Sequence, residues 1–71
     1  MPSLLTLVDD PSGDVRFWAV RGLSPAMVDG AKMDRAAATS KLRALVLRDA
    51  DRRVRTEALR VLAQYDDETA F

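Results

Sequence analysis

The chain has 71 residues, of which 48% are hydrophobic and 31% charged, and its eleven basic and eleven acidic side chains cancel. It contains neither cysteine nor histidine, which excludes disulfides and thiolate metal sites and removes the commonest metal ligand and general base. No apolar run approaches the roughly 20 residues of a membrane helix, so we expect no membrane insertion. We expect one small cytoplasmic domain without metal or cofactor.

The first half of the chain is predicted to form two helices and a short connecting helix. Pro2 suits the first turn of a helix and Pro11 disfavours helix at the residue before it, so the first helix is expected over residues 2–9. Ser12 is placed to cap a second helix over residues 13–23, which should end before Ser24-Pro25. Pro25 then begins a short helix that Asp29-Gly30 interrupts after about one turn.

The second half is predicted to form two longer helices. Apolar residues at three- and four-residue spacing indicate a helix over residues 32–48. The turn Asp49-Ala50-Asp51 follows, with Asp51 in the capping position that Ser12 holds earlier, and the last helix is expected over residues 52–65. Residues 66–71 are acidic and have no helical periodicity, so we expect a loose acidic tail.

Two segments repeat each other at a distance of 39 residues. Residues 10–23 and 49–62 are identical at six of fourteen positions. A period of this length, built on helical spacing, is typical of solenoids of stacked helical hairpins. We therefore predict an all-α superhelix forming a single domain over residues 1–65, with repeat one at 2–23, a connector at 24–31 and repeat two at 32–65.

An arginine lies within the apolar arc of the second helix of each repeat. Arg16 falls among Val15, Ala19 and Leu23 on a helical wheel, and Arg55 has the same place in the second repeat. A half-buried arginine needs a partner, and an aspartate, Asp10 or Asp49, precedes each arginine by six residues. We expect an Asp–Arg ladder that ties each turn to its own helix or to the neighbouring repeat.

The run from Leu4 to Arg16, with Ala19, Val20 and Leu23, resembles the HEAT repeat, particularly the short bacterial form named after phycobilisome lyases. The second repeat is similar to it through the residues from Asp49 to Leu62, although Ala50 stands where the first has Pro11. The resemblance implies paired antiparallel helices in a right-handed solenoid. It also implies a binding scaffold, because most such proteins are scaffolds and only a minority attach bilins or act on DNA bases. The resemblance supplies no catalytic residue.

An aromatic pair distinguishes the first repeat from the second. Phe17 and Trp18 occupy positions that face away from the core arc, where the second repeat has Thr56 and Glu57. One interpretation is a partner-binding patch, with Arg21 and the late Tyr65 as further candidates. The other is that the connecting segment, through its methionines and Val28, folds over the rings and completes the core. The two interpretations are compatible if one ring is covered and the other is presented to a partner.

The basic residues are concentrated in the middle of the chain. Residues 32–60 have nine basic and four acidic side chains, a net charge of +5, whereas residues 1–31 have a net charge of −2 and residues 61–71 of −3. Arg52 and Arg53 lie in the first turn of the last helix, and Arg48 precedes them, so the three are candidates for binding an anion or nucleic acid. Local pairing with neighbouring aspartates is the simpler interpretation.

The sequence offers no sign of catalysis. It has no glycine-rich phosphate loop, no nucleophile elbow and no cluster of cysteine or histidine. Two hairpins are fewer than the roughly three that usually make a stable array, so the chain should require further surface to pack against. We therefore predict a protein-interaction scaffold that joins a larger assembly or its own copies; anion or nucleic-acid binding and bilin-lyase-like binding remain the alternatives.

Overall fold

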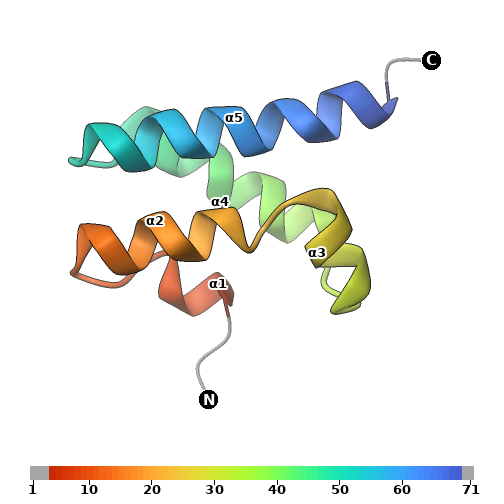
Figure 1. Ribbon diagram of the computed structural model, residues 1–71, viewed down its shortest axis with the longest axis horizontal. Helices are drawn as coiled ribbons and strands as arrows, with labels where there is room; N and C mark the ends of the chain where they lie inside the picture. The colour runs from red at the N-terminus through yellow and green to blue at the C-terminus, as the bar shows by residue number, and fades with distance from the viewer. Residues whose placement is uncertain (1–3, 70–71) are drawn as a thin grey trace.

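The computed structural model describes residues 4–69, which form helices joined by short turns (Figure 1). The elements in chain order are α1 (Leu4–Leu7), α2 (Gly13–Arg21), α3 (Pro25–Gly30), α4 (Arg35–Arg48) and α5 (Arg52–Thr69). The predicted all-α class, with two hairpins and a short connecting helix, is confirmed.

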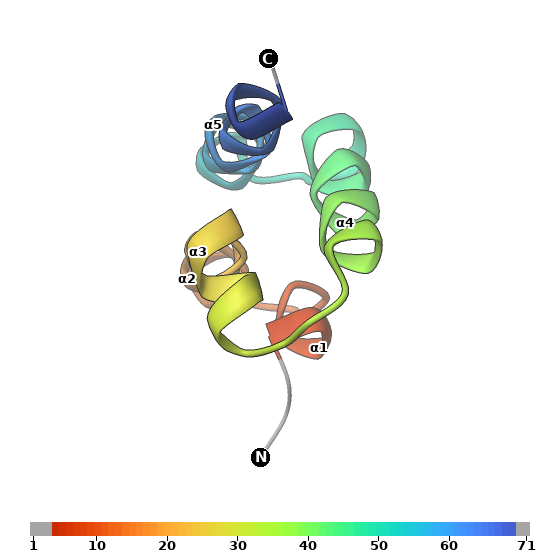
Figure 2. The same ribbon diagram turned by 90° about the vertical axis from the view of Figure 1, so that its right-hand side faces the viewer.

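The helices lie in two layers (Figure 2). One layer is the hairpin of α1 and α2, and the other is the hairpin of α4 and α5. Across the layers α2 packs on α5 and α1 on α4, while α3 crosses from the first layer to the second at one end. The principal extents are 36 × 26 × 15 Å, and the two layers lie one above the other in the view down the shortest axis (Figure 1).

Capping side chains place several helix starts. The Ser12 hydroxyl accepts a hydrogen bond from the Val15 amide at the start of α2, and the Asp51 carboxylate accepts one from the Arg53 amide at the start of α5. The corresponding cap of α4 is Asp34, which bonds the Ala36 amide and which the sequence reading did not identify.

Four helix boundaries differ from those predicted. Helix α1 ends at Leu7 instead of residue 9, because Val8 and Asp9 form a turn, and its predicted start lies outside the described residues. Helix α4 begins at Arg35 instead of residue 32, because Lys32 adopts a left-handed conformation (φ 56°) that reverses the chain after α3. Helix α2 stops at Arg21, since Gly22 and Leu23 form a closing turn. Helix α5 continues through Thr69, so the expected loose tail is helical as far as the structure describes it; residues 70 and 71 lie outside the described part.

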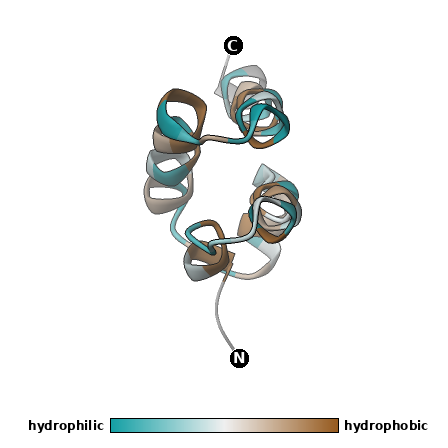
Figure 3. Ribbon diagram, turned by 90° about the vertical axis from the view of Figure 1, so that its left-hand side faces the viewer, coloured by the Kyte–Doolittle hydropathy of each residue, from teal (hydrophilic) through white to brown (hydrophobic). Residues whose placement is uncertain are grey.

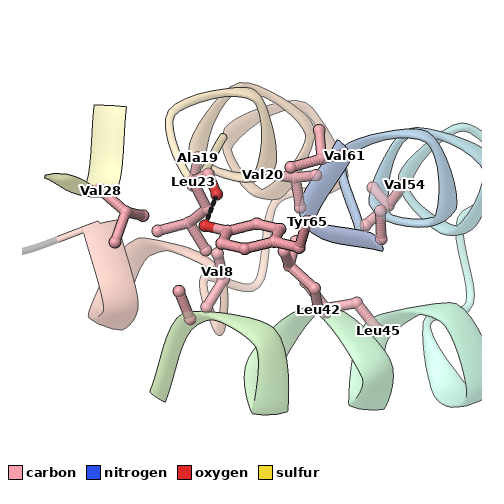
Figure 4. Close-up of a cluster of buried hydrophobic side chains, with 12 residues drawn as sticks. Val8, Ala19, Val20, Leu23, Val28, Leu42, Leu45, Val54, Val61 and Tyr65 are labelled. Carbon is pink, nitrogen blue, oxygen red and sulfur yellow. Dashed lines mark hydrogen bonds between the residues drawn. The ribbon is translucent and has the colours of Figure 1, made fainter. Parts of the chain in front are cut away.

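One hydrophobic core joins the two layers (Figure 4). The buried residues come from α2, α3, α4, α5 and the turns after α1 and α2, so every described helix except α1 contributes buried apolar side chains. They are Val8, Ala19, Val20, Leu23, Val28, Ala38, Leu42, Leu45, Val54, Ala58, Val61 and Tyr65. Hydrophobic colour also reaches the last turn of α4, on the outside of the stack, where Leu47 is exposed (Figure 3).

Candidate protein-binding surface

Trp18 projects from α2 into solvent. Its side chain is 64% exposed, although most tryptophans in folded proteins are largely buried. The ring meets Phe17 edge-on at a centroid distance of 5.8 Å, and the Arg21 guanidinium lies 5.0 Å from the centroid of the Trp18 ring. The chain thus presents a tryptophan that is held in place by neighbours on both sides.

Phe17 and Trp18 have different surroundings. Phe17 is half-buried and packs against the core, whereas the connecting segment leaves Trp18 uncovered. Within that segment Val28 is buried in the core and Met27 is exposed, so α3 completes the core without covering the indole. The interpretation in which the connector covers both rings is therefore wrong for Trp18. We call Phe17, Trp18 and Arg21 the aromatic patch.

Glu57 is buried where an outward-facing residue was expected. It is 8% exposed between α2 and α5, and its carboxylate accepts a hydrogen bond from Arg60 Nε at 2.8 Å and lies 3.7 Å from Arg21 Nε. The hydrogen bonds from Arg60 hold the pKa of the Glu57 carboxyl below its ordinary value despite burial. The same carboxylate attracts Arg21 and thereby helps to hold its guanidinium beside the Trp18 ring.

Tyr65 does not belong to any exposed surface, so its predicted role in partner binding is wrong. The ring is buried in the core, and its hydroxyl donates a hydrogen bond to the Leu23 carbonyl (Figure 4). The Arg35 guanidinium covers the ring at 5.6 Å from its centroid. The signal for burial was present in the sequence, because Val54, Ala58, Val61 and Tyr65 follow one another at helical spacing and share one face of α5.

The Asp–Arg ladder has a different pairing from the one predicted. Arg16 makes two bonds to the Asp49 carboxylate of the other repeat, from Nε at 2.8 Å and from Nη2 at 3.0 Å. Within each repeat the arginine instead reaches the aspartate's carbonyl, as Arg16 Nη1 bonds Asp10 at 2.8 Å and Arg55 Nη1 bonds Asp49 at 2.7 Å. Since the Asp49 hydrogen bond favours the charged form, the pKa of Arg16 is raised. The ladder therefore joins the layers.

The basic turn does not gather its arginines into one site. Arg53 bonds the carboxylates of Asp14 at 2.7 Å and Asp51 at 2.9 Å, which raise its pKa. Arg52 and Arg53 line an open pocket of about 340 Å³ beside Phe17, while Arg48 lines a separate pocket next to Asp49. The proposed anion site would thus consist of one paired arginine and two exposed ones that face different hollows.

Metal and membrane binding find no support in the described residues. Among the side chains that the structure describes, residues 4–66, no three acidic groups converge on a point where a cation could be held. None of the described helices combines the length and apolarity needed to cross a bilayer.

Comparison with known proteins identifies the family. The family model for HEAT repeats matches residues 1–71, the full length of the sequence, whereas no curated protein and no solved structure matches the chain. The match agrees with the stacked hairpins and with the residues at equivalent positions of the two repeats. The chain belongs to the HEAT repeat family.

Proposed function

We propose that this protein is a non-catalytic protein-interaction module that binds its partner through the aromatic patch, as a small subunit of a larger assembly or with its own copies. HEAT repeats commonly serve as protein-interaction scaffolds, and the chain is a match to that family over its whole length. Their stacked helices present extended surfaces in which single side chains provide the specificity.

The observation that carries the proposal is the exposure of Trp18. Burying a tryptophan removes a large apolar area from water, and tryptophan is enriched among the residues that contribute most to binding energy. The indole is already fixed by Phe17 and Arg21, so little side-chain entropy is lost when a partner covers it. An exposed ring with a stacked arginine offers both an apolar contact and a charge at its rim.

The test compares Trp18→Ala with a matched control, Met27→Ala, which also removes a large exposed apolar side chain. Each tagged variant is used to capture proteins from a lysate of the source cells, and its far-UV circular dichroism is recorded. We expect Met27→Ala to capture the same proteins as the wild type and Trp18→Ala to lose them, with helicity unchanged in both. Capture that does not depend on Trp18 would refute the aromatic patch as the contact.

Nucleic-acid binding receives less support from the same geometry. Arg53 is engaged by two carboxylates, and the other arginines of the basic turn are divided between two pockets. Phosphate contacts depend strongly on salt, so a gel shift at 50 mM salt that is lost at 200 mM would be needed to revive this function. We expect no retardation at either concentration.

A further inference from the structure

The 39-residue repeat makes it possible to compare each position with its own equivalent in the other layer. Val8 and Val20 of the first repeat are fully buried, because α4 and α5 cover them. Their equivalents in the second repeat are Leu47 and Leu59, which are 79% and 57% exposed. The second layer therefore exposes two leucines on its outer side, at the positions where the first layer has valines covered by α4 and α5.

Polar side chains on the two outer sides also have fewer hydrogen bonds than their equivalents between the layers. Arg16 uses three nitrogens, two on the Asp49 carboxylate, while its equivalent Arg55 uses only Nη1 within the described part of the chain, on a carbonyl. Conversely, the Asp49 carboxylate accepts bonds from Arg16 and from the Asp51 amide. The equivalent carboxylate, that of Asp10, accepts a bond from the Ser12 amide alone among residues 4–69. One end of the stack has an arginine with spare donors, and the other a carboxylate with spare acceptors.

Trp18 lies on the end that has the spare carboxylate. Its equivalent, Glu57, is buried against α2 of the preceding layer and lies beside Arg21. Trp18 is therefore placed to meet a further layer stacked before the first repeat. If the second repeat of another copy formed that layer, its Arg60 would take the place that Arg21 has beside Glu57. Arg60 is exposed, and in the existing structure Arg21 already stacks on Trp18. Between two copies, the Arg60 guanidinium would stack on the Trp18 indole at the place where Arg21 contacts Glu57 within one chain.

We propose that the C-terminal end face, consisting of Leu47, Arg55 and Leu59, docks on the N-terminal end face, consisting of Asp10 and Trp18, of a second copy of this chain. The two copies then stack head to tail by the same step that relates the repeats. The proposal rests on the proposed function, because Trp18 is common to both, and it names a second copy as the partner.

Charge complementarity favours a second copy as the occupant. The C-terminal end face, which would donate hydrogen bonds through Arg55, belongs to residues 32–60, with a net charge of +5. The N-terminal end face, which would accept them through Asp10, belongs to residues 1–31, with a net charge of −2. The specific groups agree with this distribution, since Arg55 would meet Asp10 in the geometry of Arg16 on Asp49. The contact joins two different surfaces, so each copy keeps one free end and the association continues beyond a dimer or closes into a ring.

The test uses two blocked variants of the full chain. Leu47→Glu/Leu59→Glu charges the C-terminal end face, and Trp18→Lys places a positive charge on the N-terminal end face, where Arg60 of the docking copy would lie. All three positions are exposed, so the fold should tolerate the substitutions, which far-UV circular dichroism checks. Met27→Glu is the control, as it charges an equally exposed apolar position outside both faces. If Trp18→Lys lowers helicity, Trp18→Ala takes its place.

Sedimentation velocity across a dilution series supplies the readout. We expect wild type and Met27→Glu to associate with concentration and each blocked variant alone to weaken association by about tenfold or more. An equimolar mixture of the two blocked variants should form a dimer that grows no further, because each retains the face that the other has lost. A contact between two like faces would instead leave the mixture no larger than its components, which would overturn the proposal.

The result also separates this inference from the proposed function. A wild-type chain that remains monomeric, together with Trp18-dependent capture of another protein, refutes self-docking and leaves the aromatic patch as a binding surface. If Trp18→Lys changes neither self-association nor capture, both proposals fail.

Discussion

The repeat provides a matched pair of truncations that should differ in cost because of burial alone. Val20→Ala removes two carbon atoms from a fully buried site, and Leu59→Ala removes three from the equivalent, 57% exposed site. At about 0.8 kcal/mol per buried carbon plus a cavity term, Val20→Ala should cost about 2–3 kcal/mol. Leu59→Ala should change the stability of the monomer by no more than about 0.5 kcal/mol, although it removes more.

That difference is large for a chain of this size. At about 0.05–0.15 kcal/mol per residue, the free energy of unfolding of 71 residues is about 4–11 kcal/mol, so Val20→Ala removes about a fifth or more of it. Urea unfolding followed by circular dichroism, in dilute solution where copies do not associate, should show a midpoint lowered by about 2 M for Val20→Ala, with an unchanged slope. Equal shifts for the two variants would refute the reasoning, because Leu59 would then be covered within the single chain.

Two further predictions concern close approaches and buried charge. Gly13→Ala should destabilise, because a methyl group there would lie 2.5 Å from the capping Asp51 carboxylate, whereas Gly30→Ala, with nothing within 4 Å and no positive φ, should raise the thermal midpoint. Glu57 should contribute to acid unfolding: since its pKa is lowered in the folded state, its stabilisation is present above the ordinary value of 4.5 and is lost as pH falls below it. Glu57→Gln should therefore be less stable than wild type at pH 7, and urea titrations should show the difference shrinking as the pH is lowered below 4.5.

The sequence predicted the helices well where periodicity and capping agree and less well where a turn has an unusual backbone. Ser12 and Asp51 marked the starts of α2 and α5 because each side chain satisfies an amide that has no helical partner. The start of α4 was missed by three residues, since nothing in the local pattern indicates that Lys32 takes a left-handed conformation. The positive φ there depends on how α3 is docked, which is a property of the packed chain.

Long-range pairings were harder to predict than elements. The six-residue spacing of Asp10 and Arg16 suggested a contact within the repeat, and the contact exists, but through the carbonyl. The carboxylate partner is Asp49, 33 residues away, because stacking brings the turn between α4 and α5 beside α2. Spacing along one helix shows which residues share a face of that helix. Which charged residues of the two layers meet depends on how far one layer is shifted relative to the other.

The same offset explains why equivalent positions have opposite exposures and why the residue types differ accordingly. Among the described residues, each layer has an inner side that meets the other layer and an outer side that no third layer covers, so Val20 is buried while Leu59 is exposed, and Glu57 is buried while Trp18 is exposed. Water favours polar groups on both outer sides, yet leucine and tryptophan stand there. Exposed apolar residues at the two positions where stacking would continue are most simply explained by a partner that continues it.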